Sequence, residues 1–162
     1  MVRLSLQWVL NLLFAATVLW APGEAMACIP GLQWGMDSST VEQRLEISLE
    51  SARSLDTDSS AIYRVSNQHI GDFPVEQLDL RFGNQGLEQL VYSLPSDAMT
   101  EVLAGLRTRY GSPVSTTIKH TDHAPQQVWI WTTEDDCITA VRAEDQKFLL
   151  SYRPSRIRPS LL

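Results

Sequence analysis

The stretch VEQLDLRFGNQGLEQLVYSL, residues 75–94, predicts two antiparallel strands joined by a tight turn. Leu78, Leu80 and Phe82 alternate with polar residues, which is the period-two pattern of a strand with one buried face and one wet face. The central GNQG at 83–86 contains residues that tolerate positive φ, as hairpin turns require. The second half of the stretch then returns as the partner strand.

Further elements are expected on both sides of this hairpin. Apolar residues at helical spacing predict a helix opened by Ser96 or Asp97 and ended by Gly111 and Pro113; they are Met99, Val102, Leu103, Leu106 and Tyr110. Five more strands are expected, at 61–65, 114–119, 126–133, 137–143 and 147–153. The regular spacing of the last four predicts an antiparallel meander.

An earlier helix is expected over 39–52. Ser39 and Glu42 match a capping box, in which each side chain accepts the other residue's backbone N–H. Val41, Leu45 and Leu49 form an apolar stripe at helical spacing.

The element order helix, strands, helix, strands predicts an α+β fold. In this fold two helices pack on one face of an antiparallel meandering sheet, and the two halves form a duplicated helix–strands unit. The opposite face of the sheet is expected to stay partly exposed.

The first 27 residues have the three parts of a secretory signal peptide. Arg3 supplies the positive charge, an apolar stretch follows, and the small residues Ala25 and Ala27 flank the expected cleavage site. We therefore expect a signal peptide at 1–27, one α+β domain at 28–153 and a flexible basic tail at 154–162. The expected location is the periplasm or the secreted medium.

Composition bounds the function only loosely. The 162 residues include 13 Lys and Arg against 19 Asp and Glu, which gives a formal net charge of −6. Because nucleic-acid-binding domains are normally basic, this balance argues against such a partner.

The two cysteines, Cys28 and Cys137, have three competing interpretations: a disulfide, a lipid anchor on Cys28, or two unpaired thiols. In an oxidising compartment an even number of cysteines favours a Cys28–Cys137 disulfide. Alternatively, Cys28 becomes the first residue after cleavage and carries a lipid anchor, which would be the chain's only link to a membrane.

Candidate chemical groups are few. His120 and His123, with Asp122 between them, could contribute to a Zn or Cu site, although a solvated hairpin turn is the favoured interpretation. The acidic run 134–136 lacks the spaced ligands of a Ca²⁺ loop. We therefore expect no catalytic residue, no metal and no cofactor.

Trp129 and Trp131 are the candidate partner-binding residues. On a strand they project from one face, and Val128 and Ile130 project from the other. The tryptophans either fill the core or form an exposed aromatic strip suited to a binding hot spot. Trp34 is expected to be a packing anchor.

Two short motifs resemble a known group of envelope proteins. The WGMDSSTV run at 34–41 resembles the opening before the first helix of SmpA/OmlA (BamE-like) proteins, and YGSP at 110–113 resembles their Gly-x-Pro helix stop. The architecture of that group is similar to the β-lactamase-inhibitor-protein fold, which pairs helices with antiparallel sheets. The resemblance implies a small exported bacterial protein of the cell envelope.

Three functions are compatible with these observations. The favoured one is a non-enzymatic, exported module that binds another envelope or secreted protein through a sheet face. The second is an inhibitor of a secreted hydrolase, which follows from the architectural resemblance. The third is a small metal-binding protein or enzyme that uses the His120/His123 loop.

Overall fold

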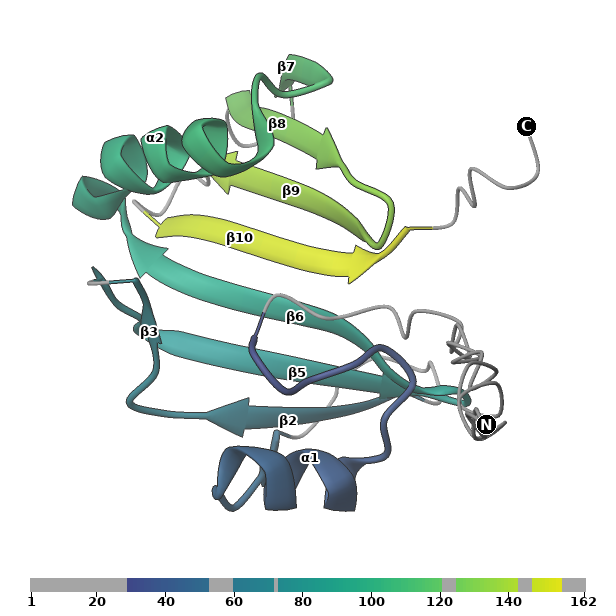
Figure 1. Ribbon diagram of the computed structural model, residues 1–162. Helices are drawn as coiled ribbons and strands as arrows, with labels where there is room; N and C mark the ends of the chain where they lie inside the picture. Colours follow the sequence, from purple (N-terminus) through teal and green to yellow (C-terminus); the bar gives the residue numbers. More distant parts are fainter. Residues whose placement is uncertain (1–28, 53–59, 72, 121–124, 143–146, 156–162) are drawn as a thin grey trace, which may run out of the picture.

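The computed structural model describes residues 29–52, 60–71, 73–120, 125–142 and 147–155. The main sheet is built from the strands β1 (Glu50–Ala52), β2 (Ala61–Val65), β5 (Gln77–Gly83), β6 (Gly86–Pro95), β7 (Ser115–His120), β8 (Pro125–Thr132), β9 (Asp136–Arg142) and β10 (Lys147–Pro154). All of its strand pairs are antiparallel, and their order is β1-β2-β5-β6-β10-β9-β8-β7 (Figure 1). A separate small hairpin joins β3 (His69–Ile70) to β4 (Phe73–Pro74).

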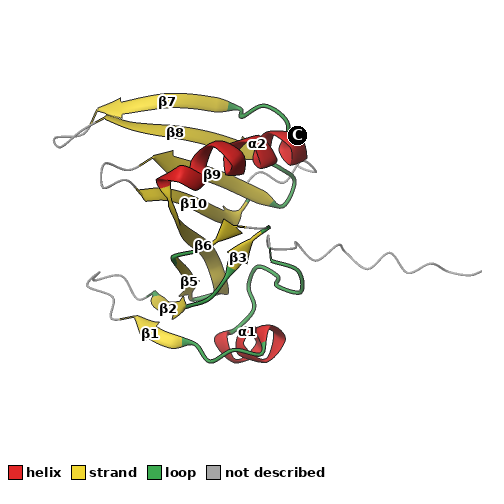
Figure 2. Cartoon of the chain, turned by 90° about the vertical axis from the view of Figure 1, so that its left-hand side faces the viewer, coloured by secondary structure: helices red, strands yellow, loops and turns green. Residues whose placement is uncertain are grey.

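The expected α+β class is wrong, because the fold is mainly antiparallel sheet. The helices are short: α1 (Ser38–Leu45) has 8 residues and α2 (Met99–Tyr110), entered through the 3₁₀ turn Ser96–Ala98, has 12. Both lie on one side of the eight-stranded sheet without forming a continuous layer over it (Figure 2). Among the described residues, no helix has the length and apolarity needed to span a bilayer.

The first helix is half as long as the sequence pattern suggests. Its N-cap is Asp37, whose carboxylate accepts the Thr40 backbone N–H at 2.9 Å, so the Ser39 capping box is wrong. The helix ends when Glu46 adopts a left-handed conformation with φ 54°. The carboxylate of Glu42 then accepts the backbone N–H of Leu49 at 2.8 Å, which holds the chain after the helix in a non-helical path.

The second helix and the meander agree closely with the sequence. Gly111 ends α2 with φ 78°, and its N–H donates to the carbonyl of Arg107. Neither Ser96 nor Asp97 caps the helix through its side chain; both lie in the preceding 3₁₀ turn. The strands predicted at 61–65, 75–94 and 114–153 are confirmed to within two residues at each end.

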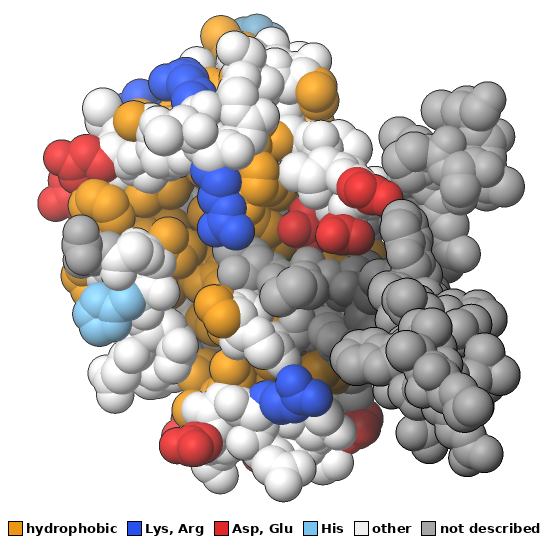
Figure 3. All heavy atoms as spheres, viewed as in Figure 1, with side chains coloured by type: hydrophobic (Ala, Val, Ile, Leu, Met, Phe, Trp, Pro, Cys, Tyr) orange, Lys and Arg blue, Asp and Glu red, His pale blue; other side chains and the backbone are white. Residues whose placement is uncertain are grey.

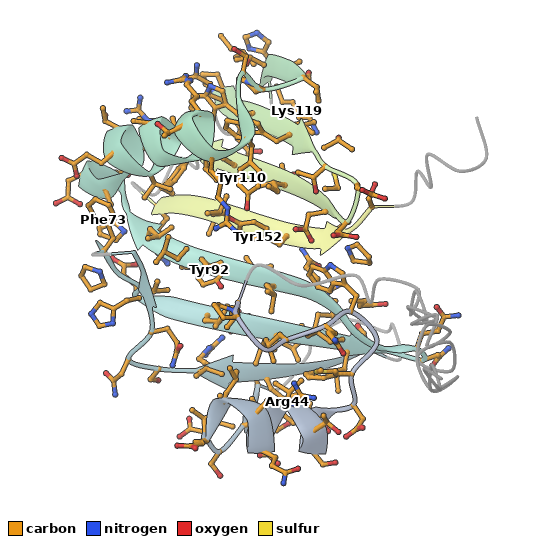
Figure 4. The ribbon with its side chains drawn as sticks, viewed as in Figure 1. Arg44, Phe73, Tyr92, Tyr110, Lys119 and Tyr152 are labelled. Atoms are coloured by element: carbon orange, nitrogen blue, oxygen red, sulfur yellow. The ribbon has the colours of Figure 1, made fainter. Side chains whose placement is uncertain are left out.

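The core lies between the sheet and the elements on the helix side. Alternate residues of the strands supply it, and the largest fully buried ones are Trp131, Phe148, Leu78, Leu80, Leu87, Leu90, Leu94, Ile138 and Leu150. On the same side, Tyr110 of α2, Tyr152 of β10 and Tyr92 of β6 follow one another across the middle of the molecule (Figure 4). Tyr92 and Tyr152 pack edge to face with ring centroids 6.0 Å apart. Apolar side chains remain visible between α2 and the β3–β4 hairpin (Figure 3).

The segment before α1 is part of this core. Leu32 is fully buried, and the backbone pairs with the start of β6: the Gly35 N–H donates to Leu87 O at 2.9 Å, and the Leu87 N–H donates to Met36 O at 2.7 Å. Gly86 adopts φ +88° and sits directly against the Gly35 carbonyl. The WGM motif therefore joins the N-terminal segment to the β5–β6 hairpin through backbone hydrogen bonds. This contact of Gly35 and Met36 with Gly86 and Leu87 is called the seam below.

Candidate binding face

The side of the main sheet that faces away from both helices is called the open face below. Cross-strand register identifies the residues that lie on it, because alternate residues of a strand point to opposite faces. Both outer hairpins, β1–β2 and β7–β8, extend to this side of the molecule, away from the helices (Figure 2).

A row of aliphatic residues crosses the open face in register. Leu149 of β10 is opposite Val141 of β9, Val141 is opposite Val128 of β8, and Val128 is opposite Thr117 of β7. Leu149 and Val141 are half-buried, whereas Val128 is only 4% exposed although it is outside the core cluster. Ile130, on the same side of β8, widens the row. The side chains of this half of the open face are thus mainly aliphatic, and Leu149, Val141 and Ile130 are partly exposed.

The other half of the open face is polar and internally bonded. Arg64 of β2 forms a 3.1 Å ion pair with Asp79, which is directly opposite on β5. The Gln77 amide donates to the second oxygen of Asp79 at 2.7 Å. Closer to the centre, the buried Gln89 amide donates to the Ser151 hydroxyl at 2.8 Å. These contacts restrict the conformations of the side chains in this half of the open face.

Charge is unevenly distributed over the open face. In the described parts of β7 to β10, the charged residues on this side are Lys119, Lys147 and Arg153. All three are basic, although the whole chain has a net charge of −6. Basic side chains thus border the aliphatic row.

The structure places Trp129 and Trp131 on the helix side, not on the open face. Their exposed fractions are 5% and 1%, and the Trp131 indole N–H donates to Gly111 O at 2.9 Å. Of the two alternatives, the core position is the one observed. The exposed aromatic strip proposed from sequence is absent at these two residues.

Cys137 lies half-buried on the open face, opposite Thr132 and Arg153, and forms no disulfide within the described part of the chain. Cys28, its expected partner, lies outside the described residues, as do the signal-peptide residues 1–27 and the tail residues 156–162. The disulfide and the lipid anchor both stay predictions.

The candidate metal ligands are not brought together in the described structure. His120 is exposed at the end of β7, while His123 and Asp122 lie outside the described residues. No group of three or more His, Cys, Asp or Glu that could hold a metal ion occurs among the residues described.

Sequence reasoning missed the most specific polar contact of the molecule. The Trp34 indole N–H donates to a carboxylate oxygen of Asp136 at 2.9 Å, across 102 residues of sequence. Asp136 is 8% exposed, and its burial raises the pKa of its carboxyl group although the indole hydrogen bond acts in the opposite direction. In the sequence, Asp136 is one of three adjacent acids, and no local signal distinguishes it from Glu134 or Asp135.

Comparison of the chain with protein-family models, curated proteins and solved structures finds no match. The fold defines a class: a mainly antiparallel sheet protein with both described helices on one side of the sheet.

Proposed function

We propose that the chain is an exported, non-enzymatic module that binds another protein of the cell envelope or secreted medium through the open face of its sheet. The observation that carries this proposal is the in-register row Leu149, Val141 and Val128, next to the ordered polar contacts of β2, β5 and β6. An apolar centre bordered by polar groups is the usual anatomy of a protein interface.

The bonded polar half supports the same function. Arg64, Gln77 and Asp79 are held by one another, so their unbound and bound positions can be the same. Pre-organised polar groups give specificity, whereas the aliphatic row supplies apolar area to bury. The basic residues that border the row favour acidic groups on the partner.

Site-specific photocrosslinking tests the proposal in cells that export the protein. A photoreactive phenylalanine analogue replaces Thr139, which lies on the open face of β9 between Ser151 and Ile130 in register. The control position is Thr100, which is exposed on α2 on the helix side. We expect a protein adduct of defined mass from position 139 and none from position 100.

A second substitution then links the adduct to the aliphatic row. Val141→Glu places a carboxylate beside Leu149 and Val128 without altering the core on the helix side. We expect it to remove the adduct while the far-ultraviolet circular dichroism stays unchanged. Equal crosslinking from Thr100, or an adduct that survives Val141→Glu in a folded variant, would refute the open face as the binding site.

A further inference from the structure

The outer strand β7 is an unprotected sheet edge. It pairs with β8 over six consecutive residue pairs with no shift of register, whereas the β5–β6 ladder is interrupted by such a shift. Proteins normally protect an edge with a bulge, an internal proline, charges or a short length. Within β7, Lys119 is the sole charged side chain of the Asp, Glu, Lys and Arg types, and there is no proline. Figure 2 shows no described element beyond this strand.

Exposed apolar surface is concentrated at the same edge. Val114 and Ile118 are the large apolar residues that are exposed in the described part of the chain, with exposed fractions of 69% and 61%. Val114 directly precedes β7 and is held to β8 by a 2.8 Å hydrogen bond from its N–H to Ile130 O. The edge therefore combines unpaired backbone groups with apolar side chains that water solvates poorly.

The opposite edge of the sheet is a poor partner for β7. It is formed by β1, which has only three residues and carries Glu50. A contact between β7 of one copy and β1 of the next would leave half of β7 unpaired. Such head-to-tail pairing also builds open chains of molecules, whereas a two-fold contact between identical edges closes on itself.

We propose that β7 pairs antiparallel with β7 of a second copy of this chain, about a two-fold axis at Ile118. This register places Ile118 opposite its own counterpart. It also places Lys119 opposite Thr117 and His120 opposite Thr116 of the second copy, so no two like charges face each other. Cross-strand pairs of β-branched residues stabilise such ladders.

The pairing has a consequence for the open face. Thr117 lies at the end of the row Leu149, Val141, Val128. Joining two β7 strands therefore continues the sheet from one copy into the other and brings two open faces into one surface. This inference does not depend on the proposed function, because the edge and the face are tested by different residues.

Sedimentation equilibrium of the mature chain tests the dimer directly. A contact between two six-residue strands should bury less surface than a typical stable complex, so we expect a dissociation constant between about 1 and 100 µM. Ile118→Lys should raise this constant at least about tenfold, because two ammonium groups would meet at the axis. Ile118→Val is the matched control and should keep the dimer. Since Ile118 is 61% exposed, neither change removes a core contact.

Disulfide trapping tests the register. In a Cys28→Ser, Cys137→Ser background, Ile118→Cys should form a covalent dimer under mild oxidation, because directly opposed residues have Cα atoms about 4.5–5.5 Å apart. Glu101→Cys, exposed on α2, is the control and should stay monomeric. A wild-type chain that remains monomeric at about 1 mM, a dimer insensitive to Ile118→Lys, or equal trapping at positions 101 and 118 would overturn the proposal.

Discussion

Replacing Gly86 by alanine is expected to break the seam between the N-terminal segment and the β5–β6 hairpin. A Cβ at this position would overlap the carbonyl oxygen of Gly35 and lie 2.6 Å from the carbonyl oxygen of Met36. Both neighbours are backbone atoms, so no side chain can rotate away. The N-terminal segment must move, which breaks the two hydrogen bonds that join it to Leu87.

The magnitude follows from two contributions. An L-residue at the φ of +88° found at Gly86 costs roughly 1–2 kcal/mol. The two hydrogen bonds with Leu87 contribute about 1 kcal/mol each. We therefore expect Gly86→Ala to lower the free energy of unfolding by about 3–4 kcal/mol, a large part of the ~5–15 kcal/mol that stabilises a typical domain.

Gly31 provides a matched control. Its φ is +87°, but a Cβ added there meets nothing within 4 Å. Gly31→Ala should therefore cost only the conformational contribution of roughly 1–2 kcal/mol. Urea unfolding followed by tryptophan fluorescence measures both variants, and their difference isolates the close approach. If Gly86→Ala is no more destabilising than Gly31→Ala, the seam does not stabilise the fold as argued.

Four further predictions concern the polar contacts and the cysteines. Trp34→Phe removes the donor to the buried carboxylate of Asp136 and should lower the free energy of unfolding, measured in urea, by about 1.5–3 kcal/mol. This loss should be smaller in an Asp136→Asn background, and an equal loss there would show that the hydrogen bond does not stabilise the fold. The pKa of Asp136 is raised, mainly by burial, so the folded state binds this proton more tightly than the unfolded state. The contribution of Asp136 to stability is therefore present below about pH 3.8 and is lost as the pH rises through the raised pKa. Asp136→Asn should remove this part of the stability–pH profile, and an unchanged profile would show that Asp136 is not the group responsible. The pKa of Asp37 is lowered to about 2, first by the Ser39 hydroxyl and then by the Thr40 N–H and hydroxyl. The contribution of Asp37 to stability is therefore present above about pH 3.8 and is lost as the pH falls toward 2. Asp37→Ala should lower the melting temperature more than Asp37→Asn, because asparagine keeps a capping oxygen. For the exported protein, intact mass should fit a chain beginning at Cys28 that is lighter by two hydrogens if the disulfide forms, and an added lipid mass would instead show the anchor.

The strands of this fold could be predicted because their alternation is strong where one face is wet. Leu78, Leu80 and Phe82 are buried as the pattern indicates, and Gln77 and Asp79 lie on the open face. The class of the fold could not be predicted from the same pattern. The spacing from Val41 to Leu49 fits a helix throughout, yet the chain leaves the helix at Glu46, because a carboxylate within the helix accepts the Leu49 N–H.

The side of β8 that lies away from the helices could not be predicted from the sequence, and the reason is physical. In β8, Val128 and Ile130 on one side and Trp129 and Trp131 on the other are all apolar. Alternation therefore cannot say which side faces the helices, and the sequence left both the core and the exposed position open for Trp129 and Trp131. The short strand β1 lacked a signal as well, since three residues show no period.

The position of Cys137 connects the redox question to the proposed interface. The thiol lies on the open face, whereas the first described residues, Ile29 to Leu32, pack against the core on the helix side. Because Cys28 directly precedes this packed segment in the sequence, a Cys28–Cys137 disulfide has to join a residue next to the helix-side segment to a thiol on the open face. If the mass measurement shows free thiols, Cys137 becomes a reporter of the open face, because a bound partner should slow its alkylation. The same partner should leave the alkylation of Thr100→Cys on α2 unchanged, since that side faces away from the contact.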